Sequence, residues 1–212
     1  MRRRRLRTRT FLPASACAGA AVLLTVGAGT AAAAPADRTD PRTEVAVLAV
    51  PAIGVEDLDV VPYEGTTDDR PGSRIQDRGV AASPYGERGG VGPGDVGNYL
   101  VTAHRLSAEG VLRDLPELEE GDSVHVTEDG TRYTYEITAT RQTSFRSERS
   151  LAEQRAEVPG KPGEEPTRAM ITLSTCATPE DDAAGNFWRD EFGNPEHRID
   201  KVGVLVAERP AS

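Results

Sequence analysis

Short apolar runs, separated by glycine, proline and acidic residues, dominate the pattern of hydrophobic and polar positions along this chain. Runs of four to eight residues with alternating character are typical of β-strands. Seven such runs are expected to be strands, over residues 45–50, 58–63, 98–103, 123–127, 132–140, 169–175 and 201–208. Glu128-Asp129-Gly130 joins the fourth run to the fifth, and Asp-Gly at such a junction predicts a β-hairpin.

Helical patterns are scarce. One short helix is expected over residues 75–82 and another over 150–156, where Ser150 would cap the N-terminus. Residues 106–118 are expected to hold a turn or two. About eight short strands with one or two short helices predict an all-β domain, built as a closed or nearly closed barrel, because closure removes exposed strand edges.

The first 36 residues differ from the rest of the chain. Six arginines and no acidic residue are followed by a weakly apolar stretch that ends near Ala32-Ala33-Ala34. This order predicts a signal peptide for residues 1–36, or an N-terminal membrane anchor with its basic end in the cytoplasm. We expect a linker over 37–43, one folded domain over 44–208 and a short tail over 209–212.

Charge changes the picture once the leader is set aside. The remaining chain holds 19 basic and 34 acidic residues, a formal net charge of −15. Such a charge disfavours nucleic acid as a partner, because phosphate binding depends on basic side chains. It suits a solvated domain outside the cytoplasm.

Cysteine usage raises a question for an exported chain. Cys17 lies within the leader, so Cys176 is the one cysteine that remains after it. Secreted domains usually pair their cysteines in disulfides, and an odd one is either an intermolecular bridge or a reactive thiol. A small buried apolar residue is the third possibility. Long polar loops, 142–168 and 177–197, flank the strand that ends at Cys176, and long loops in small domains are usually functional.

A nucleophilic thiol needs a base or a positive charge beside it and a group to hold the oxyanion. His104 ends a strand, where a barrel presents side chains to a site. His125 is expected to point to solvent, since Val124 and Val126 on either side of it would face inward. His197 is expected at the surface.

Two arginines could hold an oxyanion. Arg198 begins the last strand, and an antiparallel neighbour of the cysteine strand would bring it opposite Cys176. Arg189, in the preceding loop, is the competitor. The pairs Asp181-Asp182 and Glu164-Glu165 are most simply solvated loop charge. Phe187 and Trp188 either pin this long loop to the barrel or form a lid.

Taken together, these segments resemble the sortases, the cysteine transpeptidases of Gram-positive bacterial surfaces. Thr172–Cys176 (TLSTC) matches the family signature TLxTC, and Gly97–Arg105 (GNYLVTAHR) looks most like the strand that carries the family histidine in class E sortases of actinobacteria. The strand that begins with Arg198 matches the family's R-I strand. The likeness spans about residues 44–208. Two departures are Ala103, where many members have glycine, and the 22 positions from Cys176 to Arg198, a longer separation than in compact members.

The resemblance implies a sortase-like β-barrel and a catalytic set of Cys176, His104 and Arg198. The thiol would cleave an LPxTG or LAxTG sorting signal between Thr and Gly, and the acyl group would pass to a peptidoglycan-precursor or pilin amine. His104 would exchange the protons and Arg198 would stabilise the oxyanion. No metal or other cofactor is required.

The same resemblance implies a substrate groove, a location and partners. Thr102, Ala103, Leu173, Ser174 and Thr175 would line the groove. The partners would be secreted proteins that carry a sorting signal, and the location the outer face of the cytoplasmic membrane, or the medium if the leader is cleaved. The alternatives are an inactive sortase-like binding module and an L,D-transpeptidase, whose histidine lies much nearer its cysteine than the 72 positions seen here.

Overall fold

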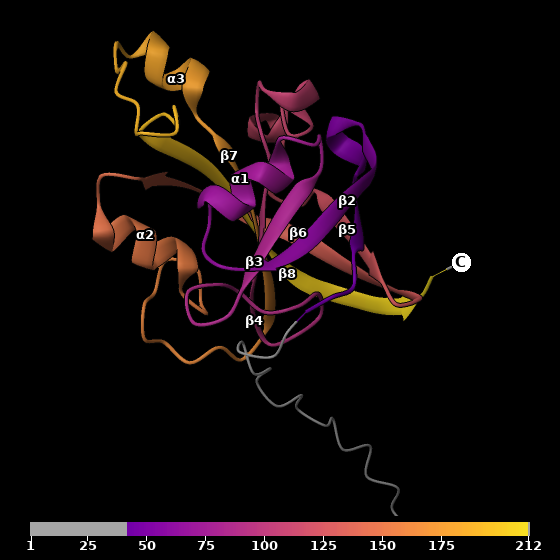
Figure 1. Ribbon diagram of the computed structural model, residues 1–212. Coiled ribbons are helices and arrows are strands. Elements are labelled where there is room, and N and C mark those ends of the chain that lie inside the picture. The colour runs from indigo at the N-terminus through magenta and orange to yellow at the C-terminus, as the bar shows by residue number, and fades with distance from the viewer. Residues whose placement is uncertain (1–41, 212) are drawn as a thin grey trace, which may run out of the picture. The chain divides into compact units, whose positions relative to one another are not determined.

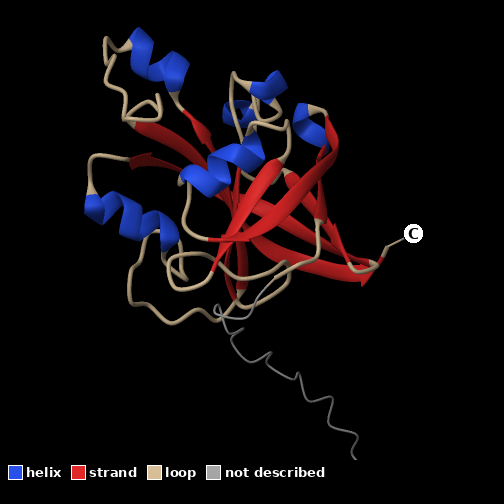
Figure 2. Ribbon diagram, viewed as in Figure 1, coloured by secondary structure: helices blue, strands red, loops and turns tan. Residues whose placement is uncertain are grey.

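Eight β-strands close on themselves into a barrel, as the strand pattern predicted (Figures 1 and 2). The structure, a computed structural model, describes residues 42–211. The strands follow one another around the barrel in the order β1-β2-β3-β4-β7-β8-β6-β5. Their bounds are β1 Ala46–Val50, β2 Val55–Glu64, β3 Ala81–Tyr85, β4 Gly97–Thr102, β5 Ser123–Glu128, β6 Thr131–Ser144, β7 Ala169–Cys176 and β8 His197–Pro210.

Three short α-helices and three 3-10 turns lie in the connections (Figure 2). The helices are α1 Arg70–Gln76, α2 Glu148–Arg155 and α3 Thr178–Ala183, and the 3-10 turns are η1 Pro51–Ile53, η2 Ala108–Gly110 and η3 Leu115–Glu117. The two turns η2 and η3 confirm the prediction for residues 106–118. Helix α3, inside the long loop after Cys176, was not predicted.

The helix predicted over 75–82 is wrongly placed, and the strand β3 was missed. Helix α1 begins earlier because Asp69 caps it, accepting a hydrogen bond from Gly72 N at 2.9 Å, and a proline stands in the first turn where its missing N–H costs nothing. Residues Ala81–Tyr85 then form β3, which is buried on both faces beside the parallel strand β2. Strand β4 is also buried throughout and could be predicted from its apolar run, whereas AASPY of β3 consists of small residues and a proline, which disfavour a strand assignment.

Helix α2 confirms the second predicted helix but corrects its cap. The N-cap is Ser147, whose hydroxyl accepts a hydrogen bond from Ser150 N at 3.2 Å. The Ser150 hydroxyl instead accepts a hydrogen bond from Ser144 N at 2.9 Å. Ser150 therefore ties the start of α2 to the end of β6.

The core fills the inside of the barrel. Apolar side chains that alternate along the strands point inward and are almost fully buried, among them Leu48, Val60, Val101, Val126, Ile137 and Leu173. Val124 and Val126 are buried while His125 between them is partly exposed and its Nδ1 lies 3.1 Å from the Thr134 hydroxyl. The outward orientation predicted for His125 is confirmed.

The predicted hairpin joins β5 to β6. Glu128 pairs with Thr131, and Asp129 and Gly130 between them have φ of 46° and 72°. Two consecutive residues of positive φ match the twist of the flanking strands, which is why Asp-Gly is favoured there. Strand β8 ends at Pro210, two positions past the predicted domain boundary.

Residues 1–36, predicted to be a leader, lie outside the described residues, as does all but the end of the predicted linker. Within residues 42–211, no helix has the length and apolar character needed to cross a membrane.

Candidate active site

Strands β4, β7 and β8 are neighbours in the barrel and bring the predicted catalytic residues to one end of it. Strands β4 and β7 run parallel, with Thr102 beside Ser174. Beyond that pair, Ala103 N donates to the Ser174 carbonyl at 3.2 Å, and the Thr175 hydroxyl donates to the Ala103 carbonyl at 2.8 Å. His104 and Cys176 are the next residues along the two segments, so they lie at the same level at the ends of neighbouring strands.

Cys176 and Arg198 face one another across β7 and β8. Their Cα atoms are register partners in the antiparallel pair, and side chains of such partners lie on the same face. Ile171 and Leu173 of β7 point into the core, so by alternation Ser174 and Cys176 point to the outer face. The thiol is free and partly exposed. It therefore lies outside the packed core, at the barrel's rim.

The surroundings of Cys176 favour the protonated form of its thiol. Burial raises the pKa of Cys176 above its ordinary value, and Arg198 and Arg105 offset this only in part. The carboxylates of Asp68 and Asp190 add to the rise. Attack by this sulfur thus requires that a proton leave it first.

Arg198 is almost completely buried, with 1 % of its surface exposed. Its Nε donates to Asp68 Oδ2 at 2.9 Å, and its Nη1 lies 3.3 Å from the carbonyl of His197. The guanidinium also stacks on the Phe145 ring, 4.1 Å from the centroid. Nη2 is buried and has no hydrogen-bond partner among the described residues. Nη2 is consequently the nitrogen of this guanidinium that could still donate a hydrogen bond to a bound group.

His104 is held by an acidic residue next to α1. Its Nε2 lies 2.9 Å from Asp77 Oδ1, so against an ionised carboxylate this nitrogen carries the proton. The other ring nitrogen, Nδ1, is then free to take up or release a proton. His104 is only 16 % exposed, whereas Asp77 is 64 % exposed.

The five predicted groove residues are all buried in this structure. Ala103 and Leu173 belong to the core, and the Thr175 hydroxyl is bound to a backbone carbonyl, so these three could meet a substrate only through their backbone. Thr102 and Ser174 are on the outer face but are covered by glutamines. Gln76 donates to the Thr102 hydroxyl and Gln154 to the Ser174 hydroxyl, at 3.1 and 3.2 Å.

The long loop after Cys176 is more ordered than expected. Asp181 is buried and accepts hydrogen bonds from the backbone and ring of His197, with Nδ1 at 2.6 Å, so the prediction of a solvated carboxylate at 181 is wrong. This pair ties α3 to the start of β8. Glu164 and Asp182 form exposed ion pairs with Lys161 and Arg189, as expected of loop charge.

Arg189 and the aromatic pair lie on the same loop. Arg189 is bound to Asp182, with 2.6 Å between Nη2 and Oδ1, and is not a register partner of Cys176. Phe187 is 71 % exposed, whereas Trp188 lies against the Arg146 guanidinium, 5.7 Å from Cζ to the ring centroid. Trp188 therefore contacts the segment before α2, and Phe187 projects into solvent.

Several residues of the site could not be inferred from the sequence. Asp68, Asp77 and Phe145 contact the predicted catalytic residues from loops that are far from them along the chain. Arg105 is the last residue of the histidine motif, and its Nη1 donates to the Cys176 carbonyl at 3.3 Å. No local pattern distinguishes an acidic residue that binds a buried arginine from one that is solvated.

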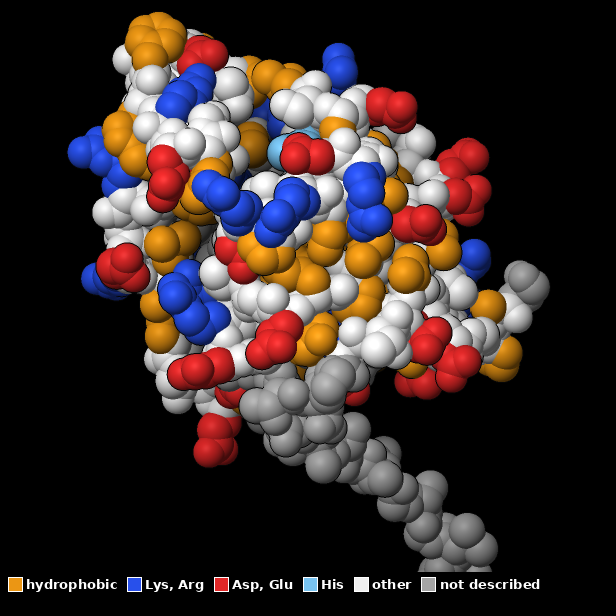
Figure 3. Space-filling model, in the orientation of Figure 1, with side chains coloured by type: hydrophobic (Ala, Val, Ile, Leu, Met, Phe, Trp, Pro, Cys, Tyr) orange, Lys and Arg blue, Asp and Glu red, His pale blue; other side chains and the backbone are white. Residues whose placement is uncertain are grey.

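The face shown in Figure 3 gathers basic side chains over α1, beside a histidine that reaches the surface next to an acidic side chain. Helix α1 and the turn after it carry the exposed residues Arg70, Arg74 and Arg78. The described part of the chain is otherwise strongly acidic, with 32 acidic and 18 basic residues. These arginines therefore lie on or beside the helix whose C-cap, Asp77, binds His104.

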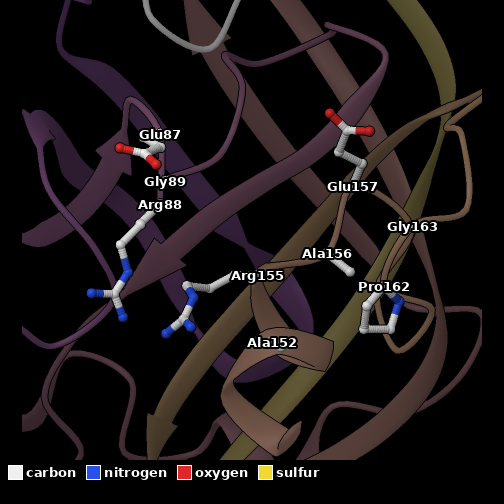
Figure 4. Close-up of a pocket in the computed structure, with 9 residues that line it drawn as sticks. All are labelled: Glu87, Arg88, Gly89, Ala152, Arg155, Ala156, Glu157, Pro162 and Gly163. Atoms are coloured by element: carbon white, nitrogen blue, oxygen red, sulfur yellow. The ribbon is translucent and has the colours of Figure 1, made fainter. Parts of the chain in front are cut away.

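A cavity of about 340 Å³ lies between the end of α2 and the loop that precedes β4 (Figure 4). Among its lining residues, Arg88 and Arg155 extend in the same direction, while Glu87 and Glu157 point away from them. Its lining residues come before β4 and β7 begin, whereas His104 and Cys176 come where those strands end. The cavity is therefore at the other end of these strands from the thiol. Among residues 42–211, no group of three or more potential metal ligands is gathered at one place.

Comparison with known proteins agrees with this architecture. Residues 48–187 match the profile of the Sortase domain family, about two thirds of the chain, including His104 and Cys176. The chain belongs to the sortase family. The matched stretch ends before Arg198, so the assignment of the arginine depends on its pairing with Cys176 in the barrel.

Solved structures of sortases share the fold. A SrtA sortase from Actinomyces oris is 20% identical, with a TM-score of 0.59 over 85% of this chain and 89% of the other. Sortase E1 from Streptomyces coelicolor, solved with a tripeptide in its active site, is 22% identical, with a TM-score of 0.59 over 81% and 93%. Sortase E from Streptomyces avermitilis is 24% identical, with a TM-score of 0.57 over 79% and 91%. A search among curated proteins found no match.

Class E sortases are thus among the structures with this fold, in agreement with the resemblance found in the strand before His104. At these identities the likeness concerns the fold. The sortase family and its barrel support a transpeptidase of the sortase type. An L,D-transpeptidase is not supported.

Proposed function

We propose that this sortase is a cysteine transpeptidase in which Cys176 cleaves an LPxTG- or LAxTG-type sorting signal between Thr and Gly. The observation that carries the proposal is the pairing of Cys176 with Arg198 across β7 and β8, with a buried arginine nitrogen that lacks an acceptor. When the sulfur attacks a carbonyl carbon, negative charge develops on the carbonyl oxygen, on the side of the thiol where Arg198 would lie. A preformed donor of this kind stabilises an oxyanion.

In the proposed reaction the Cys176 thiol gives its proton to His104, the sulfur attacks the threonine carbonyl carbon, and a C–S bond forms. The tetrahedral intermediate collapses, the C–N bond to glycine breaks, and His104 donates a proton to the departing amine. An incoming amine then attacks the thioester and gives up a proton to His104, the C–S bond breaks, and His104 returns the proton to the departing sulfur. Nε2 of His104 is held by Asp77, which leaves Nδ1 for these transfers.

The partners and the location form part of the same proposal. The acyl donor would be a secreted protein with a sorting signal near its C-terminus, and the acceptor an amine of a peptidoglycan precursor or a pilin. The basic start and apolar stretch of residues 1–36 support work at the outer face of a Gram-positive cytoplasmic membrane, by an anchored or a released enzyme.

The test is cleavage of two fluorogenic peptides, one with LPxTG and one with LAxTG, by the purified full chain. We expect cleavage of at least one of them, its loss in Cys176→Ala, and a fall of about 10²- to 10³-fold in kcat for Arg198→Ala. In His104→Ala, kcat is expected to fall by a similar factor. Arg189→Ala is the matched control and should retain activity.

Two outcomes would contradict the proposal. Cleavage of neither peptide by the wild-type chain, together with a thiol that iodoacetamide labels only after denaturation, would indicate an inactive sortase-like binding module. Retained activity in Arg198→Ala with loss in Arg189→Ala would move the oxyanion role to Arg189.

A further inference from the structure

Arg105, the residue after His104, uses every nitrogen of its guanidinium within the protein. Nε donates to the carbonyl of Arg113 at 2.7 Å, and Nη1 donates to the carbonyl of Cys176 at 3.3 Å. Nη1 and Nη2 also bind the two carboxylate oxygens of Glu180, at 2.8 and 3.1 Å. The Arg105 side chain is only 11 % exposed, while Glu180 is 44 % exposed.

These contacts join three segments that meet at the thiol. Arg113 lies in the connection that follows His104, Cys176 ends β7, and Glu180 belongs to α3. Glu180 also lies one residue from Asp181, which binds His197 beside Arg198. One side chain therefore links the segment of the histidine to the segment of the cysteine.

The geometry suits an arginine and no other residue. The planar guanidinium presents donors in fixed directions and can bind a carboxylate with two nitrogens while a third donates elsewhere. A lysine carries the same charge, but its single ammonium on a flexible stem cannot hold the Glu180 carboxylate in a fork and both carbonyls at once.

We propose that Arg105, oriented by Glu180, is a positioning residue that holds the backbone of Cys176 in place relative to His104. The proposal rests on the proposed function, in which these two residues react with the same substrate. Displacement of a reacting group by about 1 Å costs on the order of 10²-fold in rate, so a clamp at this point acts on kcat. Arg105 would not touch the substrate.

The experiment compares Arg105→Lys and Arg105→Ala with the matched controls Arg149→Lys and Arg149→Ala. Arg149 also forms an ion pair, with Glu153 at 2.8 Å, but it is 89 % exposed and lies on α2. Three quantities are measured on the full chain: kcat and KM for the peptide that the wild type cleaves, the thermal midpoint, and the pH midpoint for alkylation of Cys176 by iodoacetamide.

We expect kcat to fall about 10²-fold in both Arg105 variants while KM changes less than about threefold. The alkylation midpoint should rise in Arg105→Ala, because the guanidinium lowers the pKa of Cys176, and stay near the wild-type value in Arg105→Lys, which keeps the charge. The Arg149 variants should match the wild type. Comparison of Arg105→Lys with Arg105→Ala thereby separates the effect of removing the charge from the effect of removing the arginine's hydrogen bonds.

Wild-type kcat in Arg105→Lys and Arg105→Ala would overturn the proposal, as would a fall in kcat that only follows a lower thermal midpoint. If Arg105→Ala does not fold, Arg105→Lys and Glu180→Gln decide, and wild-type kcat in both overturns it. If the wild type cleaves neither peptide, the proposed function fails by itself. The rate of Cys176 alkylation at a pH where the thiol is fully ionised then decides for the clamp: a change in both Arg105→Lys and Arg105→Ala but in neither Arg149 variant supports it, and wild-type rates in both overturn it.

Discussion

The Asp68 carboxylate accepts a hydrogen bond from Arg198 Nε at 2.9 Å, although 130 positions separate the two residues along the chain. Both side chains are nearly inaccessible, with 1 % of Arg198 and 8 % of Asp68 exposed. Asp68 also accepts a hydrogen bond from Gln76 at 3.1 Å, and its φ of 57° lies in the left-handed region. The arginine opposite the thiol is thus held by a residue in an uncommon backbone conformation.

Loss of this carboxylate should be costly. Asp68→Ala leaves the buried Arg198 without its counter-ion, and breaking a buried ion pair in this way typically costs about 3–5 kcal/mol. Asp68→Asn should cost less, because asparagine keeps an acceptor and tolerates positive φ. Urea unfolding of both variants measures the difference. A free energy of unfolding within about 1 kcal/mol of the wild type in Asp68→Ala would show that the pair does not form.

Asp77→Ala should have a small effect on catalysis. The Asp77 carboxylate that binds His104 is 64 % exposed, and exposed ion pairs are worth about 0–1 kcal/mol. The fall in kcat/KM should therefore stay within about fivefold, which corresponds to about 1 kcal/mol. Steady-state kinetics on the cleaved peptide test this. A loss of 10³-fold or more would indicate that Asp77 acts directly on the proton transfer.

The reactivity of Cys176 should rise with pH well beyond neutrality. Burial raises the pKa of the thiol, so at pH 7 the thiolate is a small fraction and alkylation by iodoacetamide should be slow. The midpoint of the alkylation rate should lie above about 8.5, the ordinary value for cysteine. Mass spectrometry of the labelled protein gives the rate at each pH.

Arg198→Gln should move that midpoint further upward, since the guanidinium charge lowers the pKa of Cys176. Arg189→Gln is the control and should leave the midpoint in place. A wild-type midpoint below 7, or one that Arg198→Gln does not change, would contradict the electrostatic surroundings described for the thiol.

Asp200 organises the buried polar side chains behind the site. Its carboxylate accepts hydrogen bonds from Thr143 at 2.5 Å and from Gln154 at 3.0 Å, and it is 1 % exposed. Asp200→Ala leaves two buried donors unsatisfied, and we expect a loss of about 2–4 kcal/mol in the free energy of unfolding. Chemical denaturation measures it, and a loss below about 1 kcal/mol would contradict the described contacts.

The pH dependence of stability offers a separate test of Asp200. Burial raises the pKa of this carboxyl, so its contribution to stability is present below the ordinary pKa of about 3.9 and is lost as the pH rises through the folded-state pKa. Asp200→Asn does not titrate. The variant should therefore gain stability relative to the wild type as the pH rises above about 4, and a difference that stays constant with pH would refute the shift.

Some elements could be predicted because their signal is local. Each strand with one face in the core shows alternation, as β5 does at Val124, His125 and Val126. The Asp129-Gly130 turn was predictable from the positive φ that it requires. By contrast, β3 (AASPY) has no apolar run, only small residues and a proline beside its tyrosine, and α1 carries Pro71 and Gly72 in its first turn, which suggest a loop until Asp69 is known to cap it.

By itself, the sequence determined the barrel, the isolated thiol and the motif residues His104 and Cys176, since each depends on neighbours along the chain. The tertiary structure decided that these two residues lie at the same level of the barrel's rim and that Arg198 pairs with Cys176. It also decided which contacts are made by Asp68, Asp77 and Arg105. The reason is physical. Strand register and the folding back of loops bring together groups that are 22 to 130 positions apart, and no pattern along the chain encodes which acidic side chain meets which cation.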